Sequence, residues 1–149
     1  MTIMLFRLSG LLLLMIALSG CAEPPYSNLD NEQLETMLGR GVPIYDIRRA
    51  EEWHQTGVIE GSRLQTFVDD SGRVLPDFLA HLSRTVDKDD PVILICHTGN
   101  RTSTLARHLT EHMGYTQVYN VRNGITRWIR DDRPVTHLYK TPTRHRNKT

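Results

Sequence analysis

Cysteine is scarce in this chain, and the placement of the few that are present excludes one class of thiol chemistry. Among 149 residues there are only two cysteines, Cys21 and Cys96. No Cys-x-x-Cys pair occurs, so redox chemistry of the thioredoxin type is excluded. Each cysteine therefore has to be explained by its own surroundings.

An excess of charge of one sign is also lacking. The chain has 18 Lys and Arg residues against 17 Asp and Glu residues, a formal net charge of +1. Nucleic-acid binding depends on a basic surface, so this balance gives no reason to expect a nucleic-acid partner. The length suits one domain with a core large enough to fold without disulfide bonds.

Long hydrophobic runs are absent except near the N-terminus. Residues 1–20 contain a single charged residue, Arg7, which is followed by an apolar run from Leu11 to Leu18. This run is too short to span a bilayer comfortably but is typical of the apolar region of a secretory signal peptide. We therefore expect residues 1–20 to be a targeting segment and not part of the fold.

The end of this segment, Leu18-Ser19-Gly20-Cys21, resembles the bacterial lipobox. The resemblance implies cleavage before Cys21, a diacylglycerol on the Cys21 sulfur and acylation of the new amino end, for example by palmitate. Two or more acyl chains anchor a protein stably to a membrane. Ala22 resembles the outer-membrane sorting pattern, so the expected location is the bacterial cell envelope, at the outer membrane facing the periplasm. The alternative is an uncleaved membrane anchor, which also tethers the domain outside the cytoplasm.

Lipidation of Cys21 leaves Cys96 as the one thiol of the mature chain. An unpaired thiol in an oxidising compartment is prone to oxidation, so its presence is better explained by use than by chance. Residues 21–28 are expected to be a lipidated tether, because paired prolines favour an extended course. Residues 29–137 are expected to form the domain, and residues 138–149 a disordered basic tail.

Cys96 follows the apolar run Val92–Ile95 and precedes a segment with helical periodicity. It therefore lies where a strand leads into a helix. The first backbone amides of a helix lack intrahelical acceptors and carry the positive end of the macrodipole, so they stabilise a thiolate and make it nucleophilic. Gly99 allows the loop to curl around the sulfur.

Further elements follow from caps, periodicity and turn residues. Asp30 is expected to cap a helix with Gln33 at its third position, which ends near Gly39 or Gly41. Further helices are expected over residues 76–82 and 101–113, with Gly114 as the cap of the second. Strands are expected over residues 42–45, 63–67, 92–95 and 116–121. Alternating strands and helices predict a parallel α/β sheet with helices on both faces.

The run Cys96-His97-Thr98-Gly99-Asn100-Arg101-Thr102 resembles the active loop of the rhodanese family, C-x-x-G-x-R-[ST]. Two further segments resemble the same family, residues 46–53 (D-V-R-x-x-x-E-[WYF]) and residues 123–128 (G-G-[IV]-x-x-W), although Asn123 replaces the first glycine. The resemblance implies the five-stranded rhodanese fold with Cys96 at the carboxyl edge of the sheet.

The same resemblance implies a sulfurtransferase, in which Cys96 takes a sulfane sulfur from a donor, holds it as a persulfide and passes it to an acceptor such as cyanide or a thiol. This is ping-pong covalent catalysis, and no cofactor or metal is expected. The loop residues expected to bind substrate are His97, Thr98, Gly99, Asn100, Arg101 and Thr102. Asp46, Arg48 and Glu52 are expected to form a structural network of ion pairs and caps and not to take part in catalysis directly, with Asp46 and Arg48 supporting the loop. Arg101 is expected to brace the loop through a carboxylate such as Asp46.

Two other functions compete with this interpretation. A cysteine phosphatase uses C-x5-R, one residue longer than the spacing between Cys96 and Arg101, so a phosphatase is disfavoured. A tethered module that captures a persulfide and presents it to a partner protein without free turnover also needs Cys96 and stays open. His97 is the only loop residue at the entrance that could meet a dianion, so a preference for thiosulfate is not assured.

His108 and His112 form the pattern H-x-x-E-H, which occurs in a class of zinc proteases. The pair lies about 10 to 16 Å beyond the loop along the helix, at about 1.5 Å per residue. No third ligand accompanies it. We therefore expect both histidines to lie at the edge of the buried stripe and to bind no metal.

Overall fold

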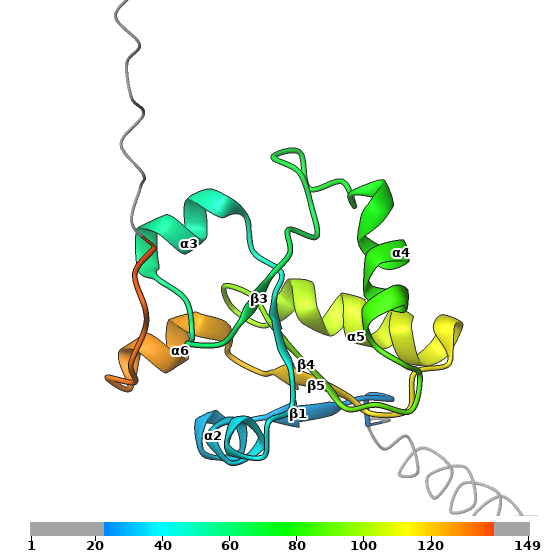
Figure 1. Cartoon of the computed structure of the whole chain (residues 1–149), viewed down its shortest axis with the longest axis horizontal. Coiled ribbons are helices and arrows are strands. Elements are labelled where there is room, and N and C mark those ends of the chain that lie inside the picture. Colours follow the sequence, from blue (N-terminus) through cyan, green and yellow to red (C-terminus); the bar gives the residue numbers. More distant parts are fainter. Residues whose placement is uncertain (1–22, 139–149) are drawn as a thin grey trace, which may run out of the picture.

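The computed structural model describes residues 23–138. The segment 1–22, which includes Cys21, and residues 139–149 of the basic tail lie outside the described residues. The described chain forms a five-stranded sheet in the order β1-β5-β4-β2-β3, in which all neighbouring strands are parallel (Figure 1). The expected parallel α/β sheet of five strands is therefore confirmed.

Short strands alternate with helices along the chain. The strands are β1 Ser27–Leu29, β2 Ile44–Asp46, β3 Arg63–Leu64, β4 Val92–Ile95 and β5 Val118–Val121. The helices are α2 Asn31–Gly39, α3 Ala50–Thr56, α4 Pro76–Thr85, α5 Asn100–Met113 and α6 Gly124–Arg130.

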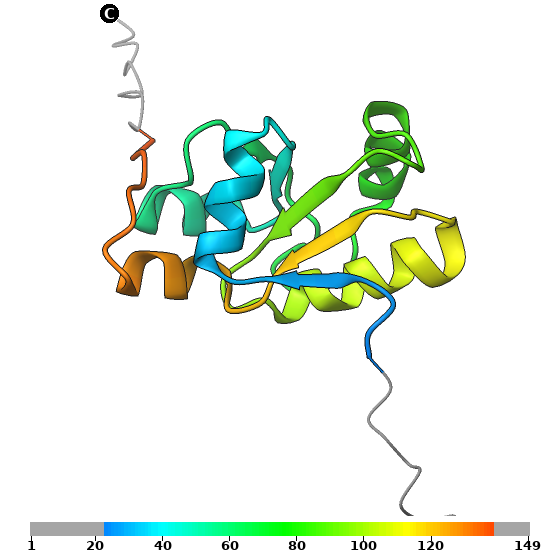
Figure 2. The same cartoon turned by 90° about the horizontal axis from the view of Figure 1, so that it is seen from below.

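Hydrophobic clusters cover both faces of the sheet. Successive residues of β4 point to opposite faces, so Val92 and Leu94 join one cluster while Ile93 and Ile95 join the other. The first cluster includes side chains of α4 and α5, and the second includes side chains of α2 and α6. Figure 2 shows these helices on the two sides of the sheet. Burial on both faces explains why all four residues of β4 are apolar.

The capping expectations agree with the structure. Asp30 accepts a hydrogen bond from the amide of Gln33 at 2.8 Å, and the Gln33 side chain accepts one from the Asp30 amide at 3.0 Å. This reciprocal pair is the capping box of α2. Gly114 ends α5 with a φ of 74°, a left-handed conformation that glycine adopts at little cost.

The structure differs from the sequence expectations at two edge strands. Ser27 and Asn28, expected in the tether, belong to β1, which pairs with β5. The strand expected over residues 63–67 is regular only at Arg63–Leu64, although the amides of Gln65 and Phe67 still donate to carbonyls of the β2 segment. Both strands are short and lie at the edges of the sheet, where alternation between polar and apolar residues is weak.

The direction of β1 fixes where the chain enters the domain. Because β1 runs parallel to β4, Ser27 lies at the amino edge of the sheet, whereas Cys96 follows β4 at the carboxyl edge. The chain preceding β1 therefore leaves the domain on the side opposite the thiol. Among residues 23–138, no helix has the length and hydropathy needed to cross a membrane.

Candidate active site

The Cys96 thiol is held at the end of the central strand β4. The residue has 0% exposure, and its Sγ accepts a hydrogen bond from the Gly99 amide at 3.2 Å. The Thr102 hydroxyl lies 3.3 Å from Sγ and donates to the Gly99 carbonyl at 3.0 Å. The loop therefore folds back so that the amide of Gly99 points at the sulfur of Cys96.

The start of α5 faces this sulfur. The helix begins at Asn100, directly after Gly99, whose φ of 90° places it in the left-handed region. A Cβ at Gly99 would overlap the carbonyl oxygen of Arg122. The first amides of a helix lack intrahelical acceptors, so those at the start of α5 add positive electrostatic potential beside Sγ.

The first turn of α6 holds the other side of the loop. The Ile125 amide donates to the Cys96 carbonyl at 2.9 Å, and the Thr126 amide donates to the His97 carbonyl at 3.1 Å. The Thr126 hydroxyl also donates to the His97 carbonyl, at 2.8 Å. A Cβ at Gly124 would lie 2.5 Å from the Cys96 carbonyl oxygen, so only glycine fits there. This role of α6 was not predicted from the sequence, in which the family-like turn at residues 123–128 was the available signal.

Arg101 is braced by Glu52 and not by Asp46. Its two terminal nitrogens donate to the two carboxylate oxygens of Glu52 at 2.9 Å and 2.6 Å. The expectation that Asp46 would pair with Arg101 was wrong, because the Asp46 carboxylate is occupied by Arg48. The general role expected for Arg101, bracing through a carboxylate, agrees with this geometry.

Asp46 and Arg48 form a completely buried ion pair beneath the site. Arg48 donates to Asp46 at 2.7 Å, and both side chains have 0% exposure. Arg48 also donates to the Thr56 hydroxyl at 2.7 Å and to the Gly57 carbonyl at 2.8 Å, at the end of α3. The pair therefore ties the end of β2 to α3, the helix that carries Glu52. Asp46 and Arg48 support the loop indirectly, as positioning residues.

Hydrogen bonds set the ionisation of the Glu52–Arg101 pair. Burial raises the pKa of Glu52, but hydrogen bonds from the Arg101 side chain and the Arg49 backbone outweigh it and lower this pKa to about 2. The hydrogen bond to Glu52 raises the pKa of Arg101 against the opposing effect of burial, with help from the negative charges of Glu52, Cys96 and Asp46. Both members of the pair therefore stay charged across the physiological pH range.

Polar side chains form the entrance to the site. His97, Thr98 and Asn100 are exposed, so these three loop residues are accessible to a substrate. The His97 side chain is 50% exposed, and its Nδ1 lies 3.7 Å from a Glu52 oxygen. The His97 side chain thus lies near α3, while its backbone carbonyl is held by Thr126 of α6.

Glu52→Gln is expected to lower the free energy of unfolding at pH 7 by about 1.5–3 kcal/mol, the range for hydrogen bonds to a charged group. The folded-state pKa of about 2 lies below the usual value of 4.5, so the ionised carboxylate stabilises the fold above pH 4.5 and loses this effect as the pH falls toward 2. Urea unfolding of the unchanged protein and of Glu52→Gln at pH 7, 5 and 3 should show that the difference between their free energies of unfolding becomes smaller as the pH falls. A difference that does not change with pH would contradict this account.

Arg101→Lys is the companion variant. Lysine keeps the charge but cannot form the two parallel hydrogen bonds that Arg101 makes with Glu52. If the brace positions the loop, this variant loses activity without losing its net charge. Full activity of Arg101→Lys would count against the brace.

His108 and His112 lie on the exposed side of α5, with ring centroids 5.3 Å apart. Within residues 23–138, no group of three or more His, Cys, Asp or Glu side chains is arranged to hold a metal ion.

Comparison with known proteins gives homologues with named sulfur chemistry. The chain is 29% identical over 120 residues to the thiosulfate sulfurtransferase GlpE of Stutzerimonas stutzeri, covering 80% of this chain and 94% of that protein. It is 33% identical over 94 residues to the mitochondrial protein HIGH ARSENIC CONTENT 1 of Arabidopsis thaliana, covering 62% of this chain. The match spans 55%, about half, of the length of the Arabidopsis protein.

Solved structures show the same fold at lower identity. A rhodanese-related protein of Thermoplasma volcanium aligns with a TM-score of 0.58 at 23% identity, covering 76% of this chain and 100% of that one. The polysulfide-sulfur transferase homodimer of Wolinella succinogenes aligns with a TM-score of 0.60 at 18% identity, covering 81% and 85%.

The family model described as "Rhodanese-like domain" matches residues 30–131, which include the loop, the Glu52 brace and the α6 turn. Sulfur transfer is named for the chain's curated relative, the thiosulfate sulfurtransferase GlpE. The chain therefore belongs to the rhodanese-like domain family.

Proposed function

We propose that the protein is a membrane-anchored sulfurtransferase that works through a persulfide on Cys96. The observation that carries the proposal is the Cys96 sulfur at the start of α5, 3.2 Å from the Gly99 amide. Four residues separate Cys96 from Arg101. This small loop suits one terminal sulfur atom better than a tetrahedral phosphate.

The reaction has two displacement steps. The Cys96 thiolate attacks the sulfane sulfur of a donor such as thiosulfate, a polysulfide or a persulfide. With thiosulfate, the S–S bond breaks and sulfite leaves with the electron pair, while Cys96 becomes a persulfide. An acceptor nucleophile, cyanide or a thiolate, then attacks the outer sulfur, and the Cys96 thiolate leaves.

The loop stabilises negative charge through both steps. The Gly99 amide donates to Sγ, and the amides at the start of α5 are available for the outer sulfur of the persulfide. These donors are fixed by α6, by Glu52 and by the buried Asp46–Arg48 pair, so little reorganisation accompanies the reaction.

His97 is expected to assist a dianionic donor when it is protonated. Glu52, with a pKa of about 2, stays ionised from pH 8 to pH 6, the range in which histidine side chains in general change charge. We expect the rate of persulfide formation from thiosulfate, relative to that of His97→Gln, to rise about threefold or more over this range, as for charges at the rim of a binding site. Single-turnover measurement of this step avoids the titration of the acceptor. A flat or falling ratio would remove His97 from this role.

Anchoring through Cys21 belongs to the same proposal. The lipobox-like sequence supports lipidation, and a location in the bacterial cell envelope, at the outer membrane facing the periplasm, follows from it. The chain preceding β1 leaves the domain on the side opposite Cys96, so a lipid at Cys21 would leave the active loop facing away from the bilayer. Labelled palmitate should enter the protein and be lost in Cys21→Ala. Label retained in this variant would contradict lipidation at Cys21.

Multiple turnover separates the enzyme from the alternative, a module that presents sulfur to a partner protein. With thiosulfate and excess cyanide, the enzyme forms many equivalents of thiocyanate per chain. A presenting module stops after about one equivalent. Release of only one equivalent would therefore favour the alternative.

A further inference from the structure

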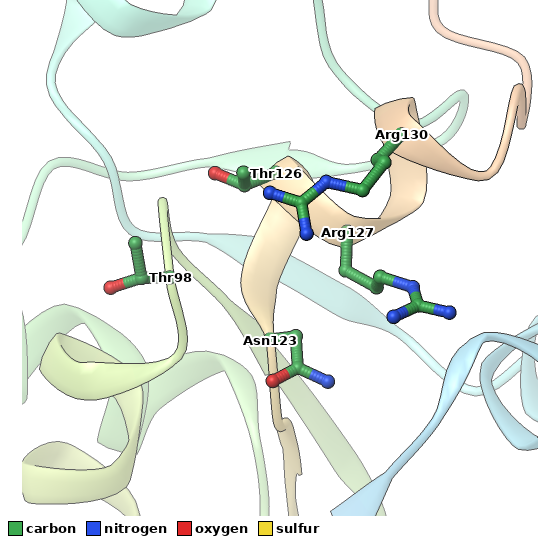
Figure 3. Close-up of a pocket in the computed structure, with 5 residues that line it drawn as sticks. All are labelled: Thr98, Asn123, Thr126, Arg127 and Arg130. Atoms are coloured by element: carbon green, nitrogen blue, oxygen red, sulfur yellow. The ribbon is translucent and has the colours of Figure 1, made fainter.

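A polar pocket lies beside the active loop and has no part in the steps described above. It has a volume of about 240 Å³ and is lined by Thr98, Asn123, Thr126, Arg127 and Arg130 (Figure 3). Every lining residue is polar or positively charged, and none is acidic. A ligand for this pocket is therefore expected to be small and negatively charged.

The pocket shares one residue with the active loop and is connected to the loop by hydrogen bonds. Thr98 is itself a loop residue, two positions after Cys96. Thr126 donates twice to the carbonyl of His97. Arg130 follows Thr126 by four residues in α6, so the two side chains share one face of the helix.

The two arginines differ in the charge they can offer. The Arg127 Nε donates to the Asp131 carboxylate at 2.9 Å, which neutralises much of its charge. In the described part of the chain no carboxylate forms an ion pair with Arg130, whose side chain runs back toward Thr126 in Figure 3. Arg130 is thus the cation of the pocket that is available to a ligand.

The length of the ligand can be inferred from where the pocket lies. The sulfonate of thiosulfate is bonded directly to the transferred sulfur, so it must stay at the loop when that sulfur meets Cys96. A pocket beside the loop is placed for a group several bonds away from the reacting sulfur. Next to His97 lies the Glu52 carboxylate, at 3.7 Å, whereas the lining of the pocket contains no carboxylate.

We propose that this pocket, through Arg130, binds the carboxylate of an organic sulfur compound whose thiol or persulfide reacts at Cys96. The inference rests on the proposed function and names the substrate class. In the acceptor direction, the thiolate attacks the outer sulfur of the Cys96 persulfide, the S–S bond breaks with its electron pair on Sγ, and the acceptor leaves as a persulfide. A carboxylated persulfide donor reacts by the reverse step, and neither direction needs an external oxidant or reductant.

The test compares two acceptors that differ only in charge, mercaptopropionate and its neutral amide, with thiosulfate saturating and the full-length chain as enzyme. For Arg130→Gln we expect the KM for mercaptopropionate to rise about three- to tenfold, as for loss of one charge-assisted hydrogen bond, while kcat and the KM for the amide stay unchanged. Arg130→Lys should restore part of the preference. Arg84→Gln is the matched control, because it removes an exposed arginine from the end of α4. Equal changes for both acceptors, or no change for either, would overturn the inference.

A second readout does not need turnover. Alkylation of Cys96 by bromopropionate, relative to bromopropionamide, should slow in Arg130→Gln but not in Arg84→Gln, with Cys96→Ser correcting for reaction elsewhere. A changed ratio in a chain that does not turn over would support the pocket and contradict the transferase. If Arg130→Gln turns over normally, and neither the KM ratio of the two acceptors nor the ratio of the two alkylation rates changes, the proposed function holds and the role of the pocket is rejected.

A further experiment with persulfide donors tests whether the pocket binds the carboxylate of the sulfur donor, of the acceptor, or of both. Incubation of the reduced protein with the persulfide of mercaptopropionate, or with that of its amide, should load Cys96 faster from the charged donor. If Arg130→Gln removes this preference, the pocket serves donors as well as acceptors. If only the acceptor preference responds, the pocket serves the acceptor. If neither responds, the inference fails.

Discussion

Cys96→Ser is expected to lower the rate of thiocyanate formation from thiosulfate and cyanide by about 10⁴-fold or more, the scale seen when a catalytic nucleophile is removed. The serine hydroxyl does not ionise near neutral pH, and an oxygen at this position cannot carry a sulfane sulfur that is later released. The rate is measured as thiocyanate formed per chain. Residual turnover within tenfold of the unchanged protein would contradict a role for Cys96 as the sulfur carrier.

The same variant should keep its fold. Sγ occupies a buried position between the Gly99 amide and the Thr102 hydroxyl, and a serine oxygen can use the same two partners. We therefore expect the thermal midpoint of Cys96→Ser to stay within a few degrees of the original. If the variant is folded but inactive, its loss of turnover is due to the missing thiol and not to misfolding.

Gly99→Ala is expected to have the second-largest effect, lowering activity about 100-fold and the free energy of unfolding by about 2–4 kcal/mol. The left-handed φ of 90° strains any other residue, and the added Cβ would overlap the carbonyl of Arg122. The loop must therefore move, which takes the Gly99 amide away from Sγ. Turnover and urea unfolding measure the two effects.

Gly114→Ala separates backbone strain from overlap. Gly114, at the other end of α5, also has a left-handed φ, of 74°, but no atom lies within 4 Å of the position its Cβ would take. This control should cost about 1 kcal/mol from strain alone and leave turnover unchanged. Equal losses in the two variants would show that the fit of Gly99 against Arg122 has no special role.

The candidate nucleophile could be placed at the end of a strand and the start of a helix from the sequence, because the features that define its surroundings are local. The apolar β4, the thiol of Cys96, Gly99 and the start of α5 follow one another within a few residues. Each has a direct physical signature in composition or periodicity. The same locality explains why the capping box at Asp30 and the end of α5 at Gly114 were predicted correctly.

The residues that hold the loop from outside could not be predicted in the same way. Glu52 is 49 positions from Arg101, and its carboxylate was less obvious than that of Asp46, which ends a strand at the same edge of the sheet. Only the structure shows that the Asp46 carboxylate already accepts hydrogen bonds from Arg48. The contact of Thr126 with His97 likewise spans 29 positions and depends on how α6 packs against the sheet.

Arg130 and strand β1 were missed for related reasons. An exposed arginine near the end of a helix is typical of any soluble surface, and only the pocket beside Thr98 distinguishes Arg130. The three residues of β1 carry no alternating pattern of their own. Their place in the sheet depends on pairing with β5, which is distant in the sequence.

The intact mass of the purified chain tests the central claim most directly. The protein is measured after incubation with thiosulfate and again after addition of cyanide, beside Cys96→Ser. We predict one added sulfur atom that cyanide removes as thiocyanate and that is absent from the serine variant. No adduct with thiosulfate, polysulfide or an organic persulfide, or an adduct that also forms on Cys96→Ser, would contradict sulfur transfer through Cys96.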